Sequence, residues 1–71
     1  MDTPARVKLG KRVKKLREKA QLTQEKLAIA VGIDYKYLQK IEGKNPPAIR
    51  IDTIEKIAKA LKITPSKLLN F

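Results

Sequence analysis

Residues 21–43 read QLTQEKLAIAVGIDYKYLQKIEG, and two short helical patterns meet at one tight turn within this stretch. The first pattern opens at Thr23, whose hydroxyl can accept a hydrogen bond from a free amide of the first helical turn. Gly32 predicts the end of that helix, because glycine tolerates the left-handed conformation that commonly ends helices. Asp34 then predicts the cap of a second helix.

The apolar residues of both patterns recur at helical spacing. Leu27, Ala28 and Val31 share one face of the first helix, and Leu38 and Ile41 share one face of the second. The other face of the second helix is polar, and such a helix can enter the major groove of DNA. An ordinary helical hairpin with a solvated outer face has the same spacing, so spacing alone leaves both interpretations open.

This pattern resembles the lambda-repressor-like (Cro/XRE) helix-turn-helix family. The matching segments are residues 9–10, 13, 16–17, 22–25, 27–28, 31–33, 37–38, 41–43, 45–46 and 51–61. A resemblance over most of the 71-residue chain is more specific than an isolated motif. It implies a single domain, residues 1–71, with an all-α, compact five-helix lambda-repressor-like fold. We expect helices at about residues 4–20, 24–31, 34–41, 52–61 and 65–69, the second and third forming the helix-turn-helix.

The charge of the chain favours a polyanionic partner. Its 17 basic and 7 acidic residues give a net charge of +10, which suits DNA, RNA or an acidic membrane face. The few aromatic residues, Tyr35, Tyr37 and Phe71, argue against a stacking platform for single-stranded bases. Composition alone does not separate DNA from RNA.

Cysteine and histidine are both absent from the sequence. Their absence excludes disulfides, metal sites built on these residues and the usual general base. Because most acidic residues are accounted for as helix caps or as one structural pair, we expect no enzyme, no metal and no cofactor. No apolar run approaches the ~20 residues that cross a bilayer, and the N-terminus lacks a signal-peptide core. A cytoplasmic protein is therefore expected.

The expected recognition helix is residues 34–41. The resemblance places Tyr35 and Lys36 at positions that reach base edges in the family, with Lys40 one turn further and Gln39 beside it. Lysine can donate to guanine O6 and N7, and glutamine can pair with adenine through two bonds. The resemblance thus implies that these four side chains contact the bases of double-stranded DNA.

Contacts to the DNA backbone are expected on both sides of this helix. Gln24 stands at a helix N-terminus, where free amides and the positive dipole end favour a phosphate. The resemblance carries a phosphate contact to Gln24, with Thr23 as a weaker candidate. Tyr37 is expected to pack near the start of the preceding helix or to reach the backbone. Lys44 and Asn45 resemble the family's backbone-contacting loop.

Arg17 adjoins the apolar stripe of the expected first helix. In the family, the matching arginine commonly pairs with the glutamate that closes the recognition helix, which is Glu42 in this chain. A guanidinium can hold a carboxylate through two parallel bonds. The resemblance therefore implies a structural ion pair that locks the first helix onto the third.

Three further helix starts are predicted from capping residues. Thr3 is expected to cap the first helix, with Pro4 at its first position. Asp52 is expected to cap the fourth helix and to form a capping box with Glu55. Thr64, followed by a proline, predicts the start of the fifth helix.

The apolar residues Leu68, Leu69 and Phe71 either close the core or form an interface. Family members often dimerise through this region, so the resemblance implies a homodimer on DNA. A two-fold dimer would bind a palindromic operator with half-sites about one helical turn apart.

Two functional interpretations remain open. The first is a sequence-specific, double-stranded-DNA-binding transcriptional regulator of the repressor type, from a phage, a restriction–modification system or a toxin–antitoxin system. The alternative is a protein-interaction module of the same fold, such as an antitoxin or a transcription-machinery adaptor, which would use Ile29 and the apolar C-terminal end. Because single exposed apolar residues are common, we expect Ile29 to be partly covered by a lysine stem instead.

Overall fold

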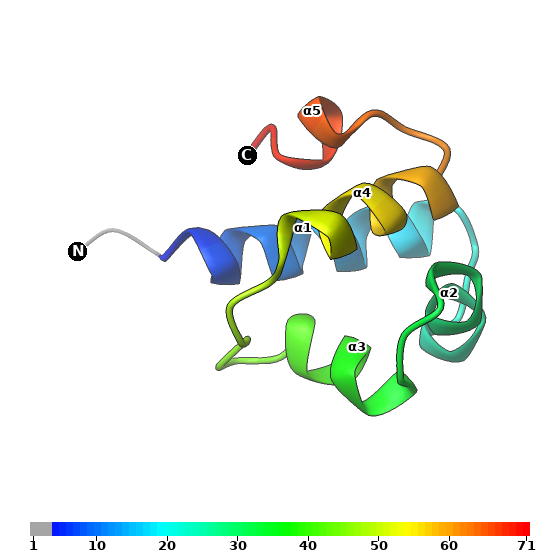
Figure 1. Cartoon of the computed structure of the whole chain (residues 1–71), viewed down its shortest axis with the longest axis horizontal. Helices are drawn as coiled ribbons and strands as arrows, with labels where there is room; N and C mark the ends of the chain where they lie inside the picture. Colours follow the sequence, from blue (N-terminus) through cyan, green and yellow to red (C-terminus); the bar gives the residue numbers. More distant parts are fainter. Residues whose placement is uncertain (1–3) are drawn as a thin grey trace.

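Five α-helices make up most of residues 4–71, the part of the chain that the computed structural model describes (Figure 1). They are α1 (Ala5–Lys19), α2 (Gln24–Val31), α3 (Tyr35–Ile41), α4 (Ile51–Ala60) and α5 (Pro65–Leu68). No described residue lies in a β-strand. The expected all-α, five-helix fold is confirmed.

The packing of the helices leaves α3 on one side of the molecule. α1 packs against α3 and α5, while α4 packs against α2 and α5. α2 also packs against α3, which follows it across the turn at Gly32. Figure 1 shows α3 and α5 on opposite sides of the molecule, with α1 and α4 between them.

Apolar side chains from all five helices meet in one core. The largest fully buried members are Val13, Leu27, Leu38, Ile41, Ile57 and Leu68. Burying a side chain of this kind contributes roughly 1.5–3 kcal/mol relative to leaving it exposed. Because α2 and α3 are too short to be stable alone, this burial is what holds them in place.

The turn between α2 and α3 forms as the sequence predicts. The hydroxyl of Thr23 accepts a hydrogen bond from the backbone amide of Lys26 at 3.1 Å. A carboxylate oxygen of Asp34 accepts one from the amide of Lys36 at 3.0 Å. Gly32 has a φ angle of 85°, the left-handed conformation that glycine adopts without steric penalty. Both helices of the motif therefore begin at their predicted caps.

The predicted start of α5 is confirmed, whereas α1 starts differently from the prediction. Thr64 accepts a bond from the amide of Lys67 at 3.2 Å, which confirms the predicted start of α5. α1 begins at Ala5 with Pro4 as its N-cap, so the proline stands one position before the helix and not at its first position. Thr3 lies outside the described residues.

The predicted capping box of α4 is wrong. The helix begins at Ile51, with Arg50 as N-cap and no capping bond from a side chain. Asp52 therefore lies inside the first turn, where its backbone is already helical and its side chain cannot cap the free amides from outside. Its negative charge still interacts favourably with the positive end of the helix dipole.

Two apolar side chains lie elsewhere than expected. Ile29 is 80% exposed, so the predicted cover by a lysine stem is wrong. It follows the buried Leu27 by two residues, which places it on the opposite face of α2. Leu68 is fully buried because α5 packs against α1 and α4. Leu68 therefore belongs to the core and cannot contact a second copy, contrary to the predicted interface.

Candidate nucleic-acid interface

The outer face of α3 carries the four side chains that were expected to contact bases. Leu38 and Ile41 anchor the helix in the core with no exposed surface. The side chains that point outward are Tyr35, Lys36, Gln39 and Lys40, all of them exposed. The helix thus combines a fully apolar inner face with a polar outer face that offers both hydrogen-bond donors and acceptors.

Two of these side chains are joined to each other. Gln39 Nε2 donates a hydrogen bond to the Tyr35 hydroxyl at 3.0 Å, one helical turn away. The bond leaves the hydroxyl hydrogen of Tyr35 and the carbonyl oxygen of Gln39 for other partners. It also restricts the rotamers of two long side chains before any ligand arrives, which lowers the entropy lost when they bind.

The expected ion pair between Arg17 and Glu42 is present at the end of α3. Arg17 Nε donates to Glu42 Oε2 at 2.9 Å, and Arg17 Nη2 donates to Glu42 Oε1 at 3.1 Å. The two side chains are only 10% and 2% exposed. Two parallel, buried bonds therefore fix the C-terminal end of α3 against α1.

The ion pair extends into a network that the sequence did not indicate. Arg17 Nη1 donates to the backbone carbonyl of Leu22 at 2.7 Å. Gln24 Nε2 donates to Glu42 Oε1 at 3.0 Å. The pair of Arg17 and Glu42 thus connects α1, the turn after it, the N-terminus of α2 and the end of α3. This network positions Gln24, the expected phosphate contact, relative to the recognition helix.

Gly10 allows α1 to approach α3 closely. A Cβ atom added at this position would overlap the backbone carbonyl oxygen of Ile41. Because the overlapping atom belongs to the backbone, a side chain at position 10 would displace the end of α3. The distance between the two helices, and so the orientation of the recognition helix, depends on this glycine.

The remaining expected backbone contacts lie at the edges of the motif. Thr23, Lys44 and Asn45 are exposed, although the Thr23 hydroxyl is occupied by its capping bond. Tyr37 is partly buried, and its side chain packs against the core and so helps to hold α3 in place.

Two lysines of α1 that lie beside the C-terminal end of α3 were not predicted as site residues from the sequence. Lys11 and Lys14 line a surface hollow together with Glu42, Gly43 and Lys44. Lys14 follows Gly10 by four residues, so it lies on the face of α1 that meets α3. The four-residue spacing from Gly10 to Lys14, combined with the close contact between Gly10 and α3, could have identified Lys14 as a site residue.

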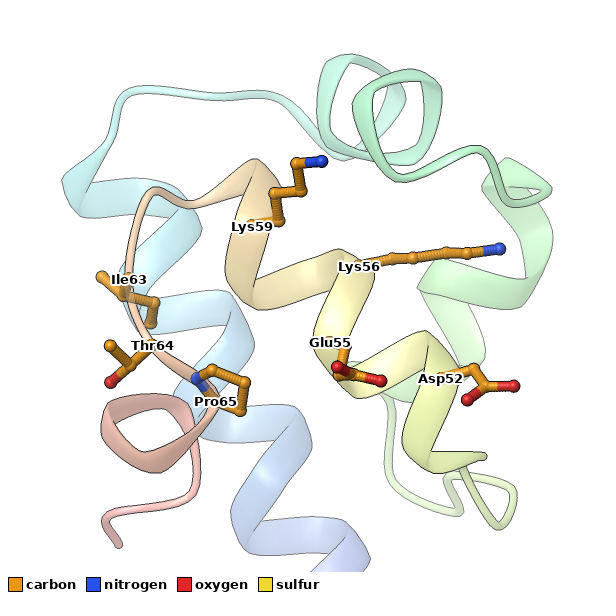
Figure 2. Close-up of a pocket in the computed structure, with 7 residues that line it drawn as sticks. All are labelled: Asp52, Glu55, Lys56, Lys59, Ile63, Thr64 and Pro65. Atoms are coloured by element: carbon orange, nitrogen blue, oxygen red, sulfur yellow. The ribbon is translucent and has the colours of Figure 1, made fainter.

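A second hollow lies along α4 and has a different character (Figure 2). Its charged lining consists of Asp52, Glu55, Lys56 and Lys59. Figure 2 shows the ammonium groups of both lysines pointing away from the carboxylate of Glu55. Because acids and bases contribute equally, this surface attracts a polyanion less than the outer face of α3 does.

Neither a metal centre nor a membrane span is found in the described part of the chain. Among residues 4–71, no group of three or more histidine, cysteine, aspartate or glutamate side chains could hold a metal ion. None of the helices in this range has the length and the apolar character needed to cross a bilayer.

The end of the chain carries exposed apolar surface. Leu69 is 40% exposed and Phe71 is 51% exposed. They line an apolar hollow with Leu9, Ile49 and Ile54. Unlike Leu68, these two expected interface residues are accessible to a second molecule.

A family model described as a helix-turn-helix domain matches residues 10–70. This range contains α2, the turn at Gly32 and α3, together with α4 and α5. The chain belongs to this helix-turn-helix family. The resemblance expected from the sequence is thereby confirmed.

Relatives of this helix-turn-helix domain are known in sequence and structure. Control protein C.BamHI from Bacillus amyloliquefaciens is 36% identical over 72 residues, which cover 100% of this chain and 88% of the relative. The restriction–modification controller protein C.AhdI from Aeromonas hydrophila has a TM-score of 0.83 and 36% identity, covering 89% of this chain and 94% of its own. A nucleoprotein complex of C.Esp1396I has a TM-score of 0.80 and 26% identity, covering 99% of both chains.

Proposed function

We propose that this chain is a transcriptional regulator of the restriction–modification controller type, which binds a specific sequence of double-stranded DNA through α3. The observation that carries the proposal is a polar, exposed recognition helix in a chain that is 36% identical to two control proteins along most of its length. A structural relative occurs in a nucleoprotein complex. The relatives are described as control or controller proteins, which agrees with the expectation of a regulator and not an enzyme.

Sequence specificity would come from α3 in the major groove. Lys36 and Lys40 would donate to guanine O6 and N7, which are acceptors on the major-groove edge. Tyr35 and Gln39 would act as a unit because they are already hydrogen-bonded to each other. Tyr35 could contact a thymine methyl group or a phosphate, while Gln39 could pair with adenine through its carbonyl oxygen and its second amide hydrogen.

Phosphate contacts would set the position of the domain on the duplex. Gln24 is held by Glu42 at the N-terminus of α2, where the helix dipole attracts a phosphate. Lys44 and Asn45, in the loop that follows α3, would contact a second part of the DNA backbone. Thr23 and Tyr37 are weaker contributors, because one is occupied as a cap and the other is partly buried. Such contacts orient a protein on DNA without carrying sequence information.

The operator would be read by two copies of the chain. Leu69 and Phe71 supply accessible apolar surface next to the hollow formed with Ile49 and Ile54. A two-fold dimer through this surface would bind a palindrome whose half-sites are about one helical turn of DNA apart.

Matched lysine substitutions test this function. Lys36→Ala/Lys40→Ala removes two proposed base contacts, while Lys56→Ala/Lys59→Ala removes the same charge from α4. Both pairs are exposed, so folding should be unaffected. The α3 pair should lower affinity for a preferred duplex by about 1–3 kcal/mol per contact and relax its sequence preference. Equal losses in the two variants, measured by gel shift, would show that charge alone binds the DNA.

A protein-interaction module of the same fold is the second candidate function. The observation in its favour is Ile29, which is 80% exposed on the outer face of α2. Under this alternative, Ile29→Ser would abolish binding of the main partner and the α3 lysine pair would not. Under the DNA-binding function, Ile29→Ser leaves DNA affinity unchanged in the same gel-shift assay.

A further inference from the structure

Basic side chains on α1 form a second cationic surface, away from the recognition helix. Gly10 and Arg17 mark the side of α1 that meets the C-terminal end of α3. A helix turns by about 100° per residue. Lys8 and Lys15 each precede one of these positions by two residues, and Lys19 follows Arg17 by two. All three lysines therefore lie on the side of α1 that faces away from α3.

Arg12 connects these lysines to α5. Its Nη2 atom donates to the backbone carbonyl of Lys67 at 3.0 Å, while its Nε atom is buried without a hydrogen-bond partner. Figure 1 shows α5 on the side of the molecule opposite α3. We call Lys8, Arg12, Lys15 and Lys19 the α1 row. The three lysines of the row are exposed to solvent.

The charge of the α1 row is not neutralised by the salt bridges found in residues 4–71. Those bridges join Arg17 to Glu42 and Arg50 to Asp52, and neither includes a member of the row. Neighbours within the row are three or four residues apart, a spacing at which like charges repel each other on a helix. Glu18 is the single acidic residue of α1. The row is therefore a surface whose repulsion an external polyanion would relieve.

We propose that the α1 row binds the phosphate backbone of a second DNA duplex, so that one protein molecule can join two DNA segments. The inference goes beyond the proposed function, which assigns no DNA contact to α1. Lys8 and Lys19 lie 11 residues apart, about 16 Å along the helix axis. One strand of a duplex presents a phosphate about every 3.4 Å along its axis, so a backbone laid along the row meets several phosphates.

Features beside the row favour a duplex over other polyanions. The hollow next to it is lined by Asn70 and Phe71 in addition to the α1 side chains. Phe71 is the one aromatic residue there, whereas single-stranded nucleic acids are usually held by stacking on several aromatic rings. The cations of the row recur every three or four residues along one helix, and this even spacing matches the regular spacing of phosphates along a strand. The carboxylates of an acidic protein have no such regular spacing.

A capture experiment tests the proposal with the full chain. A preferred duplex is fixed to beads and loaded with protein, and a fluorescent duplex of unrelated sequence is then offered. Lys8→Gln/Lys15→Gln removes two charges from the α1 row. Lys56→Gln/Lys59→Gln removes two from α4 as the matched control. Protein retained on the beads and fluorescent duplex retained on the protein are measured separately.

The α1-row variant should load onto the first duplex as the unmodified chain does. It should retain at least about tenfold less of the second duplex at 0.1 M salt, and the salt dependence of this capture should fall by about 1.8 in log–log slope. The α4 variant should match the unmodified chain in both measurements. Equal capture by all three proteins, or no capture by the loaded unmodified chain, would overturn the proposal.

Two further outcomes separate the proposal from neighbouring ideas. If polyglutamate is retained by the row and the duplex is not, the occupant is an acidic protein and the proposal is wrong.

If the protein does not load onto the first duplex, the function proposed for α3 fails. The protein is then coupled directly to the beads through its N-terminus. Loss of duplex capture in the α1-row variant alone would still support DNA binding by the row, and unchanged capture would refute the proposal.

Discussion

Replacing Glu42 by alanine should unfold much of the protein, because it leaves a buried guanidinium without its partner. Arg17 would lose both bonds to the carboxylate, at 2.9 and 3.1 Å, and Gln24 would lose its bond at 3.0 Å. The Arg17 side chain is 10% exposed, so water replaces these bonds poorly. The effect on DNA binding would follow from misfolding, since Glu42 is not itself a proposed DNA contact.

The magnitude follows from the burial of the pair. Removing one partner of a buried ion pair typically costs about 3–5 kcal/mol. A folded chain of 71 residues has a free energy of unfolding of roughly 4–11 kcal/mol. At about 4–8 °C per kcal/mol for a domain of this size, the melting temperature should fall by roughly 12–40 °C. At the upper end of this range, cooperative folding is lost.

Thermal unfolding followed by helical circular dichroism measures this loss. Arg50→Ala is the matched control, because it removes an exposed ion pair. In this pair, Arg50 Nη2 lies 3.7 Å from Asp52 Oδ2. Exposed pairs contribute about 0–1 kcal/mol, so the control should melt close to the unmodified chain. If Glu42→Ala melts at the same temperature as the unmodified chain, the structural role of the network is refuted.

Four further substitutions probe other parts of the fold and the site. Gly10→Ala should destabilise the domain by about 1–3 kcal/mol in urea unfolding, because the added Cβ would overlap the backbone of α3. Gln24→Ala should lower stability by about 1 kcal/mol and weaken binding to every duplex alike, as gel shifts would show. Leu68→Ala should lower stability by about 2–5 kcal/mol. Leu69→Ala should leave melting nearly unchanged and weaken self-association in sedimentation.

Local features of the fold were readable from the sequence because they depend on a few adjacent residues. Thr23 and Asp34 cap helices through bonds to amides two or three residues away. Gly32 ends α2 through its own backbone conformation. The predicted ends of α1 and α4 are each one residue late, and beyond them Gln21 and Lys62 adopt a left-handed φ of 59° without being glycine.

Features that depend on distant residues were only partly predictable. The family resemblance indicated that Arg17 and Glu42 would pair, but the part of Gln24 in the same network required the folded chain. Leu68 was read as a possible interface residue because it lies near the end of the chain, whereas its burial depends on how α5 packs. The exposure of Ile29 also depends on tertiary packing, since no segment within residues 4–71 covers that face of α2.

Selection from a random duplex library at about 0.15 M salt, near physiological ionic strength, tests the central claim most directly. Binding of DNA sequence by α3 in a two-fold dimer predicts an enriched palindrome with half-sites about 10 base pairs apart. The enrichment should disappear in Lys36→Ala/Lys40→Ala and persist in Lys56→Ala/Lys59→Ala. Salt-sensitive binding to every duplex without any enriched sequence would contradict the claim and leave the charge of +10 as the sole basis of DNA binding.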